Sequence, residues 1–319
     1  MSTVGICSCA GNFNNLGSGS DCLPLLEAPQ NIVFALTKKN SGVDNAVLTA
    51  GLLDLAAMDL LFEAEIAHDR FYPLNTIKEF TSEPAEEVTE ESASGAIRNV
   101  RKGRASVTYR VWSNNPGKLA EKLETLKCLG GLGVFIVDTA GNLIGKGNSS
   151  DNLIPRGIED NSLSIVAVPH ALDAGGSVDI KWTYTINSGE ETVEYIQADD
   201  FAADFDLLDV LPLEDANISS LASASTTACT FNLYKDFGSL GNRLPVKGMG
   251  GTDLLEVYNV TGAATVAFAT LVESPDGTYS GTFSAQTSTN VFRIQGKTGV
   301  TIQNGFDLKR IDDTTALIG

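Results

Sequence analysis

Three of the five cysteines, Cys7, Cys9 and Cys22, lie close together near the start of the sequence and could offer thiolates to a metal ion. Zinc sites use three or four Cys, His or carboxylate ligands at recognisable spacings. The spacing here is not a standard zinc pattern, and the two histidines, His68 and His170, lie far along the chain. We therefore expect no metal site and expect the thiols to be reduced.

Nucleophilic catalysis requires a hydroxyl or thiol beside a base, which is most often a histidine. His68 follows a predicted helix, and His170 follows Pro169 at the end of a predicted strand, so neither position favours a catalytic role. Asp199 and Asp200 form a carboxylate pair, but such pairs are expected by chance among 40 acidic residues. We therefore predict that the protein is not an enzyme.

Two further stretches are similar to ligand-binding loops but lack their defining features. Residues 130–133, Gly-Gly-Leu-Gly, follow a predicted helix, whereas a dinucleotide or phosphate loop follows a strand. Residues 204–209, Asp-Phe-Asp-Leu-Leu-Asp, lack the glycine and the terminal glutamate of a calcium loop. The sequence therefore predicts no cofactor.

The elements that would position any site are clearest between residues 104 and 145. Apolar and polar residues alternate around Tyr109, which is typical of a half-buried strand. An apolar stripe at helical spacing predicts a helix over Pro116–Lys127. The continuous apolar run 134–137 indicates a strand covered on both faces, and residues 138–142 have turn chemistry. The helical stripe consists of Leu119, Leu123 and Leu126.

A long polar segment, residues 75–103, carries acidic residues in its first part and basic residues in its second. A structureless loop of this length is unusual in a compact domain. The segment is either a disordered insert or a projecting β-hairpin, ordered by a partner, with arms near residues 88–91 and 96–100. We favour the hairpin, because an acidic and a basic limb suit pairing between identical neighbours. The predicted assembly interface consists of Glu83, Glu86, Glu87, Glu90, Glu91, Arg98, Arg101 and Lys102.

Other periodic stretches complete a β-rich region up to about residue 214. Residues 31–36 and 163–168 are apolar strands, and residues 53–67 have the spacing of a second helix. Apolar and polar residues alternate most regularly over residues 177–186, which predicts an amphipathic strand. Residues 192–196 are expected to pair with them as a hairpin across a turn.

Helical signals nearly vanish after about residue 215, and short strands alternate with turns at near-regular spacing. We therefore predict a β-sandwich over residues 218–319. Residues 276–283 resemble the turn and strand common in bacterial and phage Ig-like domains, which implies an Ig-like fold. In the strand predicted over 264–273, one face is expected to consist of Val266, Phe268 and Val272.

These patterns predict a mainly β protein of the α+β type. Its 319 residues suit two domains. We expect an extended arm over residues 1–30 and a β-sandwich or barrel domain with one or two packed helices over 31–214. The charged arm 75–103 belongs to this domain, and the Ig-like β-sandwich follows over 218–319.

The net charge of −18 disfavours binding to nucleic acid phosphates and to anionic membranes. The first residues lack the basic and apolar regions of a secretory signal peptide, and no apolar run is long enough to span a membrane. We therefore expect synthesis in the cytoplasm and no association with membranes.

The order of these elements resembles the tail tube proteins of tailed bacteriophages. The residues that carry the resemblance are 104–145, the hairpin expected at 177–196 and the arm 71–103, and the resemblance covers roughly the first two-thirds of the chain. It implies a virion protein whose six copies form a ring, and rings that stack with other tail proteins into a tube. Double-stranded DNA would pass without specific binding, because a lumen of like charge repels phosphate.

Three alternatives remain open at this point. The chain could be another virion component, such as a baseplate or capsid decoration protein, which needs no helical stacking. It could be a cell-surface adhesin or carbohydrate-binding module, although the expected absence of a signal peptide weighs against this. An enzyme is the remaining alternative.

Overall fold

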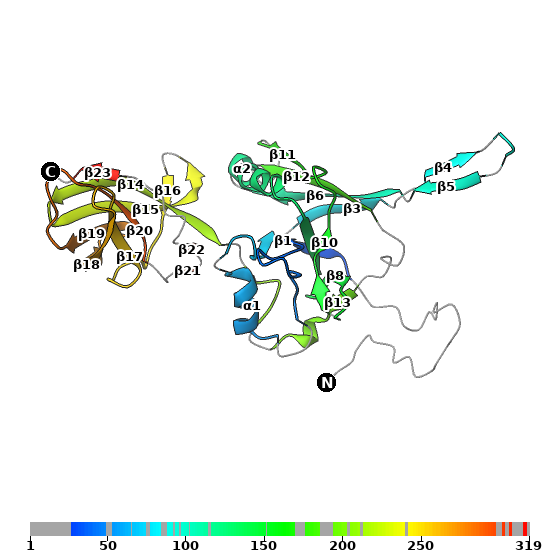
Figure 1. Cartoon of the computed structure of the whole chain (residues 1–319), viewed down its shortest axis with the longest axis horizontal. Helices are drawn as coiled ribbons and strands as arrows, with labels where there is room; N and C mark the ends of the chain where they lie inside the picture. Colours follow the sequence, from blue (N-terminus) through cyan, green and yellow to red (C-terminus); the bar gives the residue numbers. More distant parts are fainter. Residues whose placement is uncertain are drawn as a thin grey trace.

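A computed structural model gives the fold, and it confirms the predicted class. Among the residues that the structure describes, 52% lie in strands and 9% in helices, so the protein is mainly β. Figure 1 shows two groups of strands, β1–β13 and β14–β23. The structure describes residues 27–317 except 49–52, 65, 75–76, 84–87, 92, 96, 102, 114–115, 151, 170–175, 186–193, 203–204, 211–212, 240–241, 298–301, 304–305 and 308–314.

A seven-stranded antiparallel sheet forms one layer of the N-terminal part. Its central strand β7, Leu132–Asp138, pairs with β1, Pro29–Leu36, and with β8, Leu143–Gly147. Val134, Phe135 and Val137 of β7 are buried, as expected of a strand covered on both faces. The other strands are β2 (Tyr72–Leu74), β9 (Leu153–Ile154), β10 (Arg156–Gly157) and β13 (Glu194–Ile196).

A second antiparallel sheet of four strands faces the first, in the order β11-β12-β6-β3. Every second residue of β6 points inward and is buried, whereas Arg104 and Thr108 between them are exposed. This alternation gives the sheet one apolar and one polar face. The strands are β3 (Ile77–Glu83), β6 (Arg104–Trp112), β11 (Ser164–Val168) and β12 (Ser177–Thr185).

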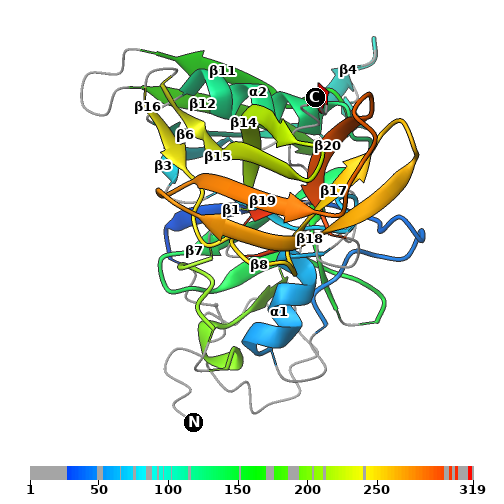
Figure 2. The same cartoon turned by 90° about the vertical axis from the view of Figure 1, so that its left-hand side faces the viewer.

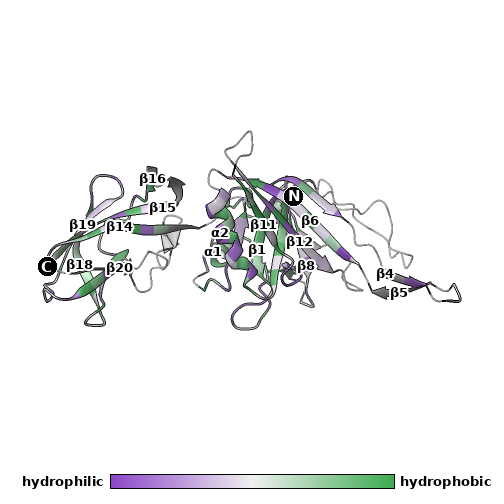
Figure 3. Cartoon of the chain, turned by 90° about the horizontal axis from the view of Figure 1, so that it is seen from above, coloured by the Kyte–Doolittle hydropathy of each residue, from purple (hydrophilic) through white to green (hydrophobic). Residues whose placement is uncertain are grey.

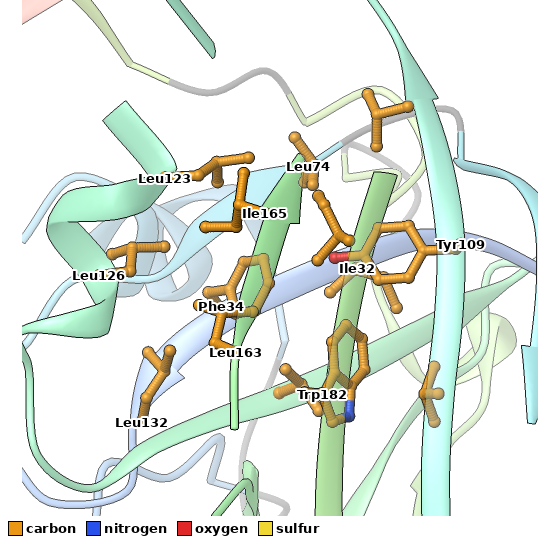
Figure 4. Packing of buried hydrophobic residues seen from close by; sticks show 14 of the residues in the cluster. Ile32, Phe34, Leu74, Tyr109, Leu123, Leu126, Leu132, Leu163, Ile165 and Trp182 are labelled. Carbon is orange, nitrogen blue, oxygen red and sulfur yellow. The ribbon is translucent and has the colours of Figure 1, made fainter. Parts of the chain in front are cut away.

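The core between these two sheets is built around Trp182. Its ring lies 5.1 Å from the Tyr109 ring and 5.9 Å from the Phe34 ring, both in edge-to-face geometry (Figure 4). The helix α2, Pro116–Lys127, has the predicted bounds and buries Leu123 and Leu126 in the same core, next to β11. The predicted docking face of this helix is therefore confirmed.

The opposite face of the seven-stranded sheet is covered by α1, Leu55–Phe62, through Met58 and Phe62. The helix is shorter than the predicted 53–67. In the turn that follows it, the Arg70 guanidinium donates a hydrogen bond of 2.9 Å to the Ala64 carbonyl. Figures 1 and 2 show α1 and α2 on opposite sides of the strands.

The pairing predicted for residues 192–196 is wrong. Strand β13 pairs with β8, where Ile196 lies opposite Leu143, and not with β12. Ile196 is buried in the core on the α1 side of the seven-stranded sheet. Burial of this side chain therefore takes the strand to the other layer.

The strands from β14 onward pair, among the described residues, only with one another in a ten-stranded sheet. Their core includes Phe231, Tyr279 and Phe292 and is separate from the two N-terminal cores. The strands are β14 (Glu214–Ser225), β15 (Ala228–Ser239), β16 (Asn242–Pro245), β17 (Leu255–Asn259), β18 (Ala264–Glu273), β19 (Thr278–Phe283), β20 (Val291–Gly296), β21 (Ile302–Gln303), β22 (Phe306–Asp307) and β23 (Thr315–Leu317).

The prediction that Val266, Phe268 and Val272 share one face of β18 is wrong for Val272. A bulge shifts the register between Phe268 and Thr270, and an extra residue reverses the alternation beyond it. Leu271 is consequently buried, while Val272 is 58% exposed.

The buried hydroxyl of Tyr109 has no hydrogen-bond partner. Because an unsatisfied buried hydroxyl carries its full desolvation cost, Tyr109→Phe should raise the free energy of unfolding by about 1 kcal/mol. The matched control is Tyr279, whose buried hydroxyl donates to the Val246 carbonyl at 2.8 Å and accepts from the Met249 amide at 3.3 Å. Tyr279→Phe should lower stability by a similar amount. Chemical denaturation followed by circular dichroism measures both, and equal signs for the two changes would contradict this assignment.

We expect residues 213–319, expressed alone, to fold and unfold cooperatively, because their strands and core are self-contained. Cys229 of β15 reports on this fold, since burial raises the pKa of its thiol to about 12 and prevents ionisation at neutral pH. Iodoacetamide should therefore modify Cys229 only after denaturation, in the fragment and in the full chain, as mass spectrometry would show. Rapid modification in the native fragment, with protection in the full chain, would mean that the fragment does not fold alone.

Candidate functional site

The charged arm forms a β-hairpin that projects from the N-terminal part. Strand β4, Val88–Glu91, pairs antiparallel with β5, Ile97–Arg101, and among the described residues these strands pair only with each other. Figure 1 shows the hairpin beyond the ends of β3 and β6, and Figures 1 and 3 show it on the side opposite the C-terminal strands. The arms lie within one residue of those expected near 88–91 and 96–100.

The predicted interface residues occupy three kinds of position. Glu90 and Glu91 are exposed on β4, and Arg98 and Arg101 belong to β5. Glu83 ends β3 on the four-stranded sheet, where its carboxylate accepts a hydrogen bond of 3.0 Å from the Ser106 hydroxyl. Three of them, Glu86, Glu87 and Lys102, lie outside the described residues.

The hairpin brings one acid and one base of the predicted interface together within a single chain. Glu90 lies opposite Arg98, whereas Glu91 lies opposite Ile97 and Arg101 opposite Val88. Cross-strand partners of opposite charge stabilise a hairpin modestly. The hairpin predicted from the sequence is present in the structure, and the expectation that a neighbouring chain stabilises it stays a prediction. The acidic and basic limbs pair with each other.

A second candidate surface is the solvent-facing side of the four-stranded sheet, which we call the outer face. It presents the residues of β11, β12, β6 and β3 that alternate with the buried ones. One row crosses all four strands: Val166 lies opposite Asp179, Asp179 opposite Arg110, and Arg110 opposite Lys78. The next row runs parallel to it and consists of Ser164, Lys181, Thr108 and Thr81.

Arg110 lies at the centre of the outer face and is held by two carboxylates. Its Nε and Nη2 donate to the two Asp179 carboxylate oxygens at 2.6 and 3.1 Å, the bidentate geometry that suits a guanidinium. Its Nη1 lies 2.9 Å from Oε2 of Glu79. The hydrogen bonds and charge of Asp179 raise the pKa of Arg110 above its ordinary value.

The outer face is balanced in charge, unlike the chain as a whole. Arg104, at its edge, pairs with Glu159 at 2.9 Å. The cations of the face and its edge are Lys78, Arg104, Arg110 and Lys181, and the carboxylates are Glu79, Glu83, Glu159 and Asp179. The excess acid of the −18 chain therefore lies elsewhere.

Sequence reasoning missed the contacts of Arg110 with Asp179 and Glu79. The strands that carry Arg110 and Asp179 were predicted, and both residues lie at polar positions where polar and apolar residues alternate clearly. Their register was not predicted, because pairing across residues distant in sequence leaves no local pattern. Glu79 was also inconspicuous, since it is one of many glutamates in a polar stretch.

The described residues contain no group of three or more His, Cys, Asp or Glu side chains arranged to hold a metal ion. The cysteines Cys7, Cys9 and Cys22 lie outside the described part of the chain. No helix within that part is long and apolar enough to cross a membrane. Comparisons with protein-family models, curated proteins and solved structures found no match to this chain.

The register of the hairpin predicts how a charge swap behaves. Arg98→Glu sets two acids opposite each other and should weaken the hairpin, which trypsin or chymotrypsin would then cut faster. Adding Glu90→Lys in the same chain should restore resistance. The control is Glu91→Lys with Arg98→Glu, because Glu91 lies opposite Ile97. If resistance to proteolysis returns only when the single variants Arg98→Glu and Glu90→Lys are mixed, the two charges pair between chains instead.

Proposed function

We propose that this chain is a structural virion protein that assembles into stacked rings of a phage tail tube. The role of the chain would be structural, and it would depend on contacts between identical surfaces of neighbouring copies. The alternative virion roles and the adhesin role also fit a β-rich chain, but they do not require the projecting hairpin.

The observation that carries the proposal is the hairpin itself. An isolated two-stranded hairpin is at best marginally stable in water, because it has no third strand or helix to cover it. Strands β4 and β5 pair only with each other among the described residues, so contact with another surface would stabilise them. A projecting element that docks on an identical neighbour makes a head-to-tail contact, and such contacts close into rings or continue as filaments.

The outer face supports a conduit role. The other sheet is covered by α1 on its far side, whereas no described helix covers the outer face of β11-β12-β6-β3, which is largely polar. We assign this face to the lumen. Its charges are balanced, so it would neither attract nor strongly repel DNA. This differs from the strongly acidic lumen expected from composition, and it still avoids the salt-dependent adhesion of a basic surface.

Replacing residues 84–102 with Asn-Gly tests the role of the hairpin. The replacement leaves a five-residue connection, Asn-Gly followed by residues 103–105, between Glu83 of β3 and its register partner Ser106, so the sheet should be retained. We expect this variant to remain a folded monomer in analytical ultracentrifugation under conditions in which the natural chain forms large particles.

The control for this experiment is Lys247→Ala on the C-terminal part, which should assemble normally because it changes only an exposed ion pair with Asp276. Assembly of the hairpin-less chain to the same size as the natural chain would remove the main support for the proposal.

A further inference from the structure

We propose that Asp179 and Glu79 mask Arg110, and that this masking keeps the outer face from binding the phosphates of a nucleic acid. The inference rests on the proposed passage of DNA along this face. It names the residues that make the face non-adhesive, and it predicts that removing them creates a polyanion-binding site.

Without its two carboxylates, Arg110 would be part of a cluster of cations. It lies at the centre of the face, with Lys78 opposite it on β3 and Lys181 diagonal to it on β12. A guanidinium presents five N–H donors in a planar fork that matches phosphate oxygens. Three cations so close together would form a phosphate site if no carboxylate intervened.

The carboxylates occupy the donors that phosphate would need. Asp179 accepts from Nε and Nη2, and Glu79 accepts from Nη1 at 3.1 Å through Oε1. A phosphate must therefore displace one of two carboxylates that already have favourable geometry. Both also repel the approaching anion.

The residue that supplies the second carboxylate, Glu79, has a costly backbone conformation. Its φ is +55°, in the left-handed region that a residue with a side chain adopts rarely. It lies in a bulge, where Glu79 and Phe80 together lie between Lys78 and Thr81, which pair with Arg110 and Thr108. Phe80 packs against the core, and Glu79 reaches the outer face beside Lys78.

A purely structural role would be that the carboxylates separate Lys78 from Arg110, since like charges directly opposite destabilise a sheet. This role and masking make different predictions. If the role is structural, removing the carboxylates lowers stability without creating affinity for DNA. Masking predicts that affinity appears and that it depends on Arg110.

The test is the isosteric double variant Glu79→Gln with Asp179→Asn in the full chain. Its affinity for a labelled double-stranded DNA of arbitrary sequence is measured by fluorescence anisotropy at several salt concentrations. We expect the double variant to bind DNA about tenfold more tightly than the natural chain at low salt. Its affinity should also fall more steeply with added salt, by about the slope that one additional phosphate contact contributes. Adding Arg110→Gln should return binding to the level of the natural chain.

The matched control is Asp209→Asn with Asp253→Asn, which changes the net charge equally at exposed sites away from the outer face. Affinity no greater than that of this control, or affinity that persists after Arg110→Gln, would overturn the proposal. Circular dichroism of each variant shows whether the fold is retained. Particle formation by the natural chain is measured separately. Its absence would count against the tube proposal, whereas the DNA affinities of the variants test masking alone.

Discussion

The packing of Trp182 between the two N-terminal sheets determines the geometry of the surfaces outside it. Its ring meets Tyr109 of the neighbouring strand and Phe34 of the facing sheet. Because side chains alternate along a strand, fixing Trp182 inward fixes Asp179 outward on the same strand. A slip of one residue would move the apolar set to solvent and separate Asp179 from Arg110. The core therefore specifies the outer face without contacting it.

The projecting hairpin lies beyond the reach of this core. The strands β3 and β6 are held by the packing of Ile77, Val107 and Val111, whereas β4 and β5 pair only with each other within the described part of the chain. Their register sets Glu90 opposite Arg98, and cross-strand pairs of opposite charge generally add little to the stability of a hairpin. A rigid sandwich that carries a marginal, charged extension suits an element whose full stability comes from assembly.

Sequence patterns predicted those elements whose information is local. The bounds of α2 follow from Pro116, the leucine stripe and the glycines after it, where Gly131 has a positive φ of 75°. The arms of the β4–β5 hairpin were likewise readable. The signals for α2 and for the hairpin each lie within about a dozen consecutive residues.

Features set by distant partners could not be predicted in this way. The partner of β13 depends on where Ile196 is buried, and the inversion along β18 depends on a bulge against β19. The charge-balanced outer face depends on the register of three strands. Of the candidate site, the strands of the hairpin were therefore anticipated, whereas the interface role of its charged residues stays a prediction. The Arg110 contacts were not anticipated.

The central claim is that identical copies assemble into a hollow tube. Negative-stain electron microscopy of the purified full chain tests it most directly. The account predicts rings with a stain-filled centre, or tubes of constant diameter built from such rings. A preparation that contains only monodisperse single chains, across protein concentrations and salt conditions that favour association, would contradict the claim.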